Sequence, residues 1–201
     1  MTDREQDLLD RGVTFVESGE SRIFIGYRQA SANNQDPVIV RFDDGVQTWY
    51  RQDIETSGDD GQGYGLVWDG ADTLYGVFSA TGTQGSSDLD YRRYTSAGWL
   101  SSYGQGGGAK AVVILKIDPE DASVSGGTFL YSRLQNGNTN SMQVTGLHLQ
   151  GDELVVNANS WFSPLDVNRS LIDVSGLGGS PFDYTITFSG DLKQARSAEV
   201  R

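Results

Sequence analysis

The chain has no cysteine and only one histidine, His148, among its 201 residues. The lack of cysteine excludes disulfide bonds, thiolate metal ligands and cysteine nucleophiles. A single histidine cannot supply a multi-histidine metal centre, and no serine–histidine–aspartate pattern surrounds it. We therefore expect His148 to be a structural residue on the solvent face of a strand.

Basic residues and long hydrophobic runs are also scarce. The 15 lysines and arginines are outnumbered by 27 acidic residues, which gives a net charge of −12. Such a surface repels phosphate backbones, so we expect no nucleic-acid partner. No segment approaches the roughly 20 apolar residues of a membrane helix, so no membrane insertion is expected. Residues 1–11 lack the apolar core of a secretory signal, which predicts a cytoplasmic protein. Signal-less export to an extracellular location would leave the same pattern.

Glycine, in contrast, is abundant, with 26 residues spread between apolar runs. This distribution indicates many tight turns and not one flexible linker. Three segments share one pattern, in which an apolar strand end, a polar turn with a glycine and a second apolar strand follow one another. The three turn glycines are Gly19, Gly70 and Gly151. Glycine supplies the positive φ that short hairpin turns require, so the pattern predicts three β-hairpins.

Each predicted hairpin is followed by a second pair of strands, which gives units at about 13–56, 64–133 and 142–200. The sequence thus predicts an all-β fold of three four-stranded antiparallel units, arranged like propeller blades in a single repeat domain over 13–201. A β-sandwich is the alternative, because its turns would have a similar spacing. Residues 2–11 predict a short helix that ends at Gly12, so residues 1–12 are expected to form an N-terminal helical arm.

The middle unit resembles bacterial β-propeller repeats of the SBBP type. The glycines 106–108 lead into the apolar run Val112–Pro119, and the aromatic-bearing strand Gly126–Tyr131 follows. The segments Trp68–Gly70 and Leu74–Gly76 are similar to the hairpin that opens such a repeat. The resemblance implies propeller-like packing of the strands. Three blades do not easily close a ring. We therefore hypothesise that two copies of the chain associate to form a six-bladed ring.

The most unusual segment is 80–108, between the second and third strands of the middle unit. It concentrates aromatic and arginine side chains, the types that anchor protein interfaces, and Trp161 adds a smaller example in the last unit. The candidate binding residues are Tyr91, Arg92, Arg93, Tyr94, Trp99, Tyr103 and Trp161. The alternative is that the segment folds back and its aromatic rings cover the core.

Carboxylates are plentiful, but nearly all accompany turn glycines, where aspartate is favoured for local backbone hydrogen bonds. The segment Ser57–Gly63 comes nearest to a calcium loop but lacks the later bidentate acid, so we expect no cofactor, with Ca²⁺ at this segment as the alternative. No nucleotide-binding or zinc-protease motif is present. No pair of carboxylates stands out as catalytic, so no catalytic residue is assigned.

These observations favour a non-catalytic module that binds or assembles proteins and presents the aromatic and arginine segment on a β scaffold. A lectin-like carbohydrate-binding module is one alternative, with Trp99, Tyr103 or Trp161 stacked on sugar rings. An acid/base hydrolase that uses turn carboxylates is the other.

Overall fold

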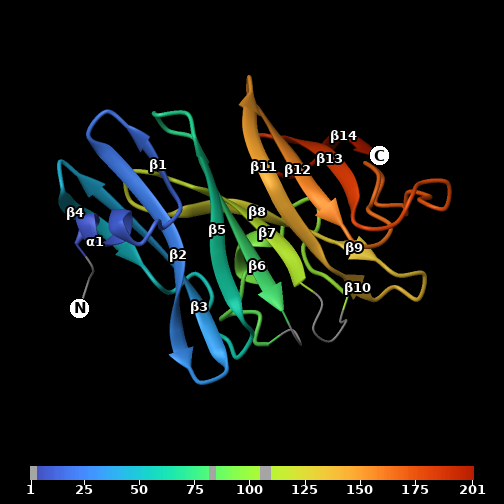
Figure 1. Ribbon diagram of the computed structural model, residues 1–201, viewed down its shortest axis with the longest axis horizontal. Helices are drawn as coiled ribbons and strands as arrows, with labels where there is room; N and C mark the ends of the chain where they lie inside the picture. Colours follow the sequence, from blue (N-terminus) through green and yellow to red (C-terminus); the bar gives the residue numbers. More distant parts are fainter. Residues whose placement is uncertain (1–3, 82–84, 105–109) are drawn as a thin grey trace.

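A computed structural model describes residues 4–81, 85–104 and 110–201. Its strands form three four-stranded antiparallel sheets, in each of which the order in space follows the order in the chain (Figure 1). The first sheet comprises β1 (Phe15–Ser18), β2 (Ser21–Ser31), β3 (Asn34–Asp43) and β4 (Val46–Arg51). The second comprises β5 (Gly61–Trp68), β6 (Leu74–Thr81), β7 (Lys110–Ile117) and β8 (Val124–Leu130). The third comprises β11 (Met142–Gln150), β12 (Glu153–Ser160), β13 (Phe182–Ser189) and β14 (Ala195–Val200). The all-β class and the antiparallel four-strand groups are therefore as the sequence predicted.

The remaining elements are short. Strands β9 (Ser132–Arg133) and β10 (Thr139–Asn140) form a two-stranded sheet that the sequence did not indicate. Helix α2 (Arg92–Thr95) lies in the segment between β6 and β7. Helix α1 spans Glu5–Asp10, and the backbone N–H of Arg4 donates to the Asp7 carboxylate at 3.2 Å at its start. Residues 2 and 3 of the predicted helix, and the glycines 106–108, lie outside the described residues.

The turn glycines behave as the hairpin pattern predicts. Gly19, Gly70 and Gly151 adopt φ values of +58°, +81° and +63°, in the left-handed region that favours glycine. They join β1 to β2, β5 to β6 and β11 to β12, and each joined pair is antiparallel. The sequence signal for these turns therefore has a direct backbone cause.

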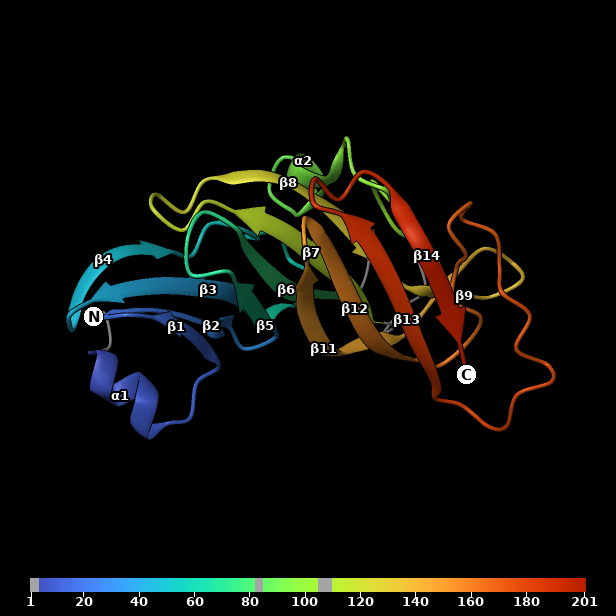
Figure 2. The same ribbon diagram turned by 90° about the horizontal axis from the view of Figure 1, so that it is seen from above.

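The second sheet is the middle layer of the molecule, as Figure 2 shows from above. Val113 and Leu115 of β7 point to a core shared with the first sheet, while Val112 and Ile114 point to a core shared with the third. A strand with cores on both sides needs apolar side chains on both faces. This explains why residues 111–115 form an unbroken apolar run where a half-exposed strand would alternate.

The two outward faces of the molecule differ. On the first sheet, Phe24, Val40 and Phe42 face outward and form a small core with Leu8 of α1. On the third sheet, His148 of β11 and Thr187 of β13 lie opposite Val155 of β12, so these three side chains share one face. The adjacent residue of β12, Leu154, points to the core on the other face. His148 is exposed there. No sheet is closed within the described residues, and whether two copies complete a ring stays a hypothesis.

Candidate functional site: a groove along strand β5

The aromatic side chains of the segment between β6 and β7 point into the protein. Tyr91, Trp99 and Tyr103 are 1%, 2% and 7% exposed. Their rings pack on core rings, with centroids 5.6 Å apart for Tyr91 and Phe78 and 5.3 Å apart for Tyr103 and Phe129. These three side chains therefore anchor the segment to the cores, which is the alternative that the sequence left open.

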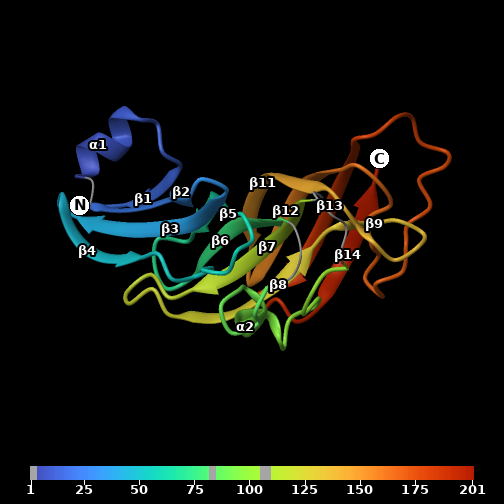
Figure 3. The same ribbon diagram turned by 90° about the horizontal axis from the view of Figure 1, so that it is seen from below.

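Trp99 contacts a core ring that is further away in the sequence than those contacted by Tyr91 and Tyr103. Its ring lies 5.5 Å from that of Phe188 on β13, and its indole N–H donates to the Val167 carbonyl oxygen at 3.2 Å. The segment from the second sheet is thus joined to the third sheet and to the loop that follows β12. Figure 3 shows this segment, with α2, from below.

The basic side chains of the same segment hold it in place. The Arg92 guanidinium forms an ion pair with Asp90 at 2.7 Å. Arg93 donates to the carbonyl oxygens of Ile54 at 3.1 Å and Asp88 at 3.2 Å, and its guanidinium lies 4.8 Å from the centroid of the half-buried Tyr94 ring. Both arginines are therefore engaged by the protein itself.

Trp161, the seventh candidate, is different because 37% of its surface is exposed. It lines a pocket of about 420 Å³ between the second and third sheets. The other lining residues carry amide, hydroxyl and amino groups or are apolar: Gln62, Tyr64, Ser79, Lys110, Asn140, Ser141, Met142 and Gln143.

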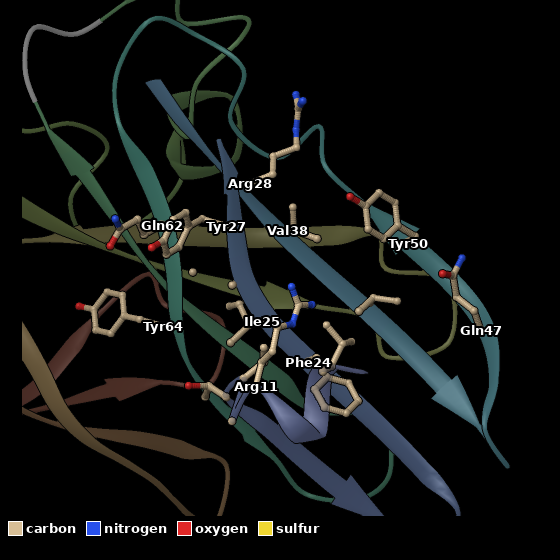
Figure 4. A pocket seen from close by; sticks show the side chains of 17 residues that line it. Arg11, Phe24, Ile25, Tyr27, Arg28, Val38, Gln47, Tyr50, Gln62 and Tyr64 are labelled. Atoms are coloured by element: carbon tan, nitrogen blue, oxygen red, sulfur yellow. The ribbon is translucent and has the colours of Figure 1, made fainter. Parts of the chain in front are cut away.

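A larger pocket of about 620 Å³ lies between α1, the outward side of the first sheet and β5. Figure 4 shows Tyr27, Gln62 and Tyr64 on one side of this space and Tyr50 with Gln47 on the opposite side. Tyr27 is 53% exposed, so its ring is available at the surface. The volume falls within the usual range for ligand sites.

The two pockets meet at β5, because Gln62 and Tyr64 line both of them. We call the two adjoining pockets together the β5 groove, lined by the residues of both. Strand β5 can pack closely against β2 because glycines alternate with larger residues along it. A Cβ atom on Gly63 would come closer than 3.0 Å to the Ile25 side chain, so only glycine permits this close packing on β2. Gln62 and Tyr64 are left to face the groove.

Most polar groups of the groove have fixed positions. The Tyr64 hydroxyl accepts from the Val144 N–H at 3.3 Å, and burial raises the pKa of Tyr64 to about 12, so it stays protonated at neutral pH. The Gln62 amide donates to the Gln35 side chain. Arg28 donates to the buried Asp36 carboxylate at 2.6 Å. The groove therefore offers preformed aromatic, amide and guanidinium surfaces.

The described lining of the groove contains basic side chains and no acidic ones. Its described lining residues include Arg11, Arg28 and Lys110 but no aspartate or glutamate. The chain as a whole, in contrast, has 27 acidic residues. Aromatic faces with amides and cations, and without carboxylates, can bind a polar ligand that is neutral or anionic.

Acidic side chains gather elsewhere, where the connection from β4 to β5 meets the second sheet and the segment between β6 and β7. Glu55 is 1% exposed, and it lines a small cavity with Asp59, Asp60 and Asp90. Burial first, and then the nearby carboxylates, raise the pKa of Glu55 to about 7. Within the part of the chain that the structure describes, no three acidic or histidine side chains are arranged to hold a metal ion. The expectation of no cofactor, with Ca²⁺ at Ser57–Gly63 as the alternative, stays a prediction from the sequence.

No protein-family model matches the chain, and no curated protein sequence matches it significantly. The similarity to SBBP-type repeats stays a prediction. In residues 4–81, 85–104 and 110–201, no helix is long and apolar enough to cross a membrane.

The sequence indicated Trp161 but missed the other side chains of the groove. Tyr27, Gln62, Tyr64 and Lys110 lie on three different strands. The one usable signal was the alternation of glycine with larger residues in Gly61–Gly65, which indicates a close approach of two backbones.

Proposed function

We propose that the protein is a non-catalytic carbohydrate-binding module that holds an extended glycan in the β5 groove. In this proposal the three sheets are arranged like consecutive propeller blades, and the groove follows the strand that opens the middle blade. The observation that carries the proposal is the lining itself, in which exposed aromatic rings stand among amides and cations without carboxylates.

Each group has a clear task in glycan binding. The exposed rings of Tyr27 and Trp161 provide flat apolar faces on which sugar rings can stack. Amides such as Gln47, Gln62 and Gln143 can donate to and accept from sugar hydroxyls. A glycosidase would need two carboxyl groups beside the bond that breaks, and the described lining of the groove supplies none.

The groove supports this function better than the segment between β6 and β7 supports protein binding. Tyr91, Trp99 and Tyr103 are buried in the cores, and Arg92 and Arg93 are bonded to the protein. The aromatic side chains on which a protein interface would depend are thus committed to folding.

A glycan array, followed by calorimetric titration of the best-binding oligosaccharide, tests the proposal. Tyr27→Ala and Trp161→Ala should each weaken binding about tenfold, because each removes a stacking face worth roughly 1–2 kcal/mol. Tyr94→Ala is the matched control, since this half-buried tyrosine lies outside the groove and its loss should leave the affinity unchanged. Absence of binding to every glycan on the array would contradict the proposal, as would a loss of binding in the control variant alone.

A further inference from the structure

The three cations of the β5 groove are not equivalent. Arg28 donates to the buried Asp36 carboxylate at 2.6 Å, so its charge is largely compensated. Arg11 donates through Nε to the Asp7 carbonyl oxygen at 3.1 Å, which holds its guanidinium against α1. Lys110 forms no ion pair with any described residue, and its side chain is exposed at the start of β7. No described carboxylate therefore compensates its positive charge.

Lys110 shares its end of the groove with Trp161. Both line the pocket of about 420 Å³, together with the side chains of Asn140, Gln143 and Ser79. The residues at this end therefore carry an ammonium group, a partly exposed indole, and amide and hydroxyl groups. The backbone N–H of Lys110 donates to the Ser141 hydroxyl at 3.1 Å, which fixes the lysine to the loop beside β11.

A sugar that carries a carboxylate matches these groups. Its ring can lie on the Trp161 indole, its hydroxyls can bond to the amides, and its carboxylate can accept from the Lys110 ammonium group in a charge-assisted hydrogen bond. The chain as a whole has a net charge of −12 and repels anions, so an anionic ligand is held only where the local charge is reversed. The groove is such a place, because no acidic side chain appears in its described lining.

We propose that the Lys110 and Trp161 end of the groove selects a uronate residue, so that the ligand of the protein is an acidic glycan. This proposal rests on the carbohydrate-binding function proposed above. An acidic peptide shares the carboxylate but lacks the rigid ring with an apolar face that Trp161 would hold.

The test compares oligouronates with the same molecules after their carboxyl groups have been reduced to alcohols. Oligogalacturonate, oligomannuronate and oligoglucuronate, each paired with its carboxyl-reduced form, are titrated calorimetrically into the full chain. At least one acidic form should bind about tenfold more tightly than its reduced counterpart. The preference should shrink as salt is added, because the charge pair is partly exposed to solvent.

Two variants assign the preference to Lys110. Lys110→Met keeps the aliphatic stem but loses the charge, so it should bind the acidic and the reduced forms with similar affinity. Lys110→Arg keeps the charge and should retain most of the preference. Because Lys110 is exposed, both variants should fold normally, and circular dichroism checks this.

Three outcomes would overturn the inference. Equal affinity for the acidic and reduced forms would remove the uronate preference and leave glycan binding intact. Binding to none of the six oligosaccharides, together with an empty glycan array, would defeat both proposals. Binding to a polyglutamate peptide as tight as to the best oligouronate would show that any carboxylate suffices, so that the ligand class is not an acidic glycan.

Discussion

The buried carboxyl group of Glu55 should make the stability of the protein depend on pH. The side chain is 1% exposed, and one of its oxygens accepts the Ser57 N–H at 2.7 Å. The other oxygen, Oε2, has no hydrogen-bond partner among the described residues. Burial is the largest cause that raises the pKa of Glu55, the Ser57 hydrogen bonds oppose it, and the charges of Asp36 and Asp59 add to it. The ionised form is therefore poorly accommodated in the folded protein.

The size of the effect follows from the difference in pKa. Folding raises the pKa of Glu55 from 4.5 to about 7, and one pKa unit corresponds to about 1.4 kcal/mol. A raised pKa means that the folded protein binds the proton more tightly than the unfolded chain does. The contribution to stability is complete below pH 4.5 and is lost as the pH rises through 7. Above pH 8 the wild-type protein should therefore carry a penalty of about 3 kcal/mol from this group.

Glu55→Gln should remove that penalty, because the amide stays neutral at every pH and has nearly the shape of the protonated acid. We expect the two proteins to have similar free energies of unfolding at pH 5 and the variant to be more stable by about 2–3 kcal/mol at pH 8. Urea denaturation followed by tryptophan fluorescence across this pH range measures both values. Glu199→Gln is the matched control, since this exposed glutamate on β14 should not change the pH profile. An identical dependence on pH in the wild-type protein and in Glu55→Gln would refute the reasoning.

Two further substitutions test how the layers are held together. Gly63→Ala should destabilise the protein by about 1–3 kcal/mol, because the added Cβ would collide with Ile25 of the neighbouring sheet. Gly176 has open space around it, so Gly176→Ala should have little effect and serves as the control. Equal denaturation midpoints for the two variants would count against close packing of β5 on β2. Arg41→Met should cost about 2 kcal/mol, because the nearly buried guanidinium joins the first sheet to the loop after β7, where it donates to the Pro119 carbonyl oxygen at 2.8 Å and to the Glu120 carboxylate at 2.8 Å. The exposed Arg201→Met serves as its control in the same denaturation assay, and a loss no larger than that of the control would show that this contact does not hold the layers together.

The strands could be predicted because their signals are local. Alternating apolar residues and turn glycines act within a few positions of the chain, so the hairpins at Gly19, Gly70 and Gly151 were visible in the sequence. The unbroken apolar run at 111–115 also has a local signature, although only the structure explains it by cores on both faces. The short pairing of β9 with β10 gives no such signal, because two-residue strands are too short to show a period.

The site could not be predicted in the same way, because burial is decided by distant partners. Tyrosine, tryptophan and arginine serve both as interface anchors and as core residues, and Trp99 is buried by Phe188, from another sheet. The β5 groove likewise combines Tyr27 from the first sheet with Trp161, which directly follows strand β12 of the third sheet. Their relation depends on how the sheets pack, which no spacing in the sequence reveals.

The most direct test of the proposed site is to map the ligand contacts residue by residue. The isotopically labelled protein would be titrated with the best-binding oligosaccharide, and the amide and indole resonances followed by NMR. The proposal predicts the largest shifts at Tyr27, Gln62, Tyr64 and Trp161, with little change at Arg93 and Tyr94. Shifts concentrated in residues 85–104, with the groove residues unaffected, would contradict it and return the binding site to the segment between β6 and β7.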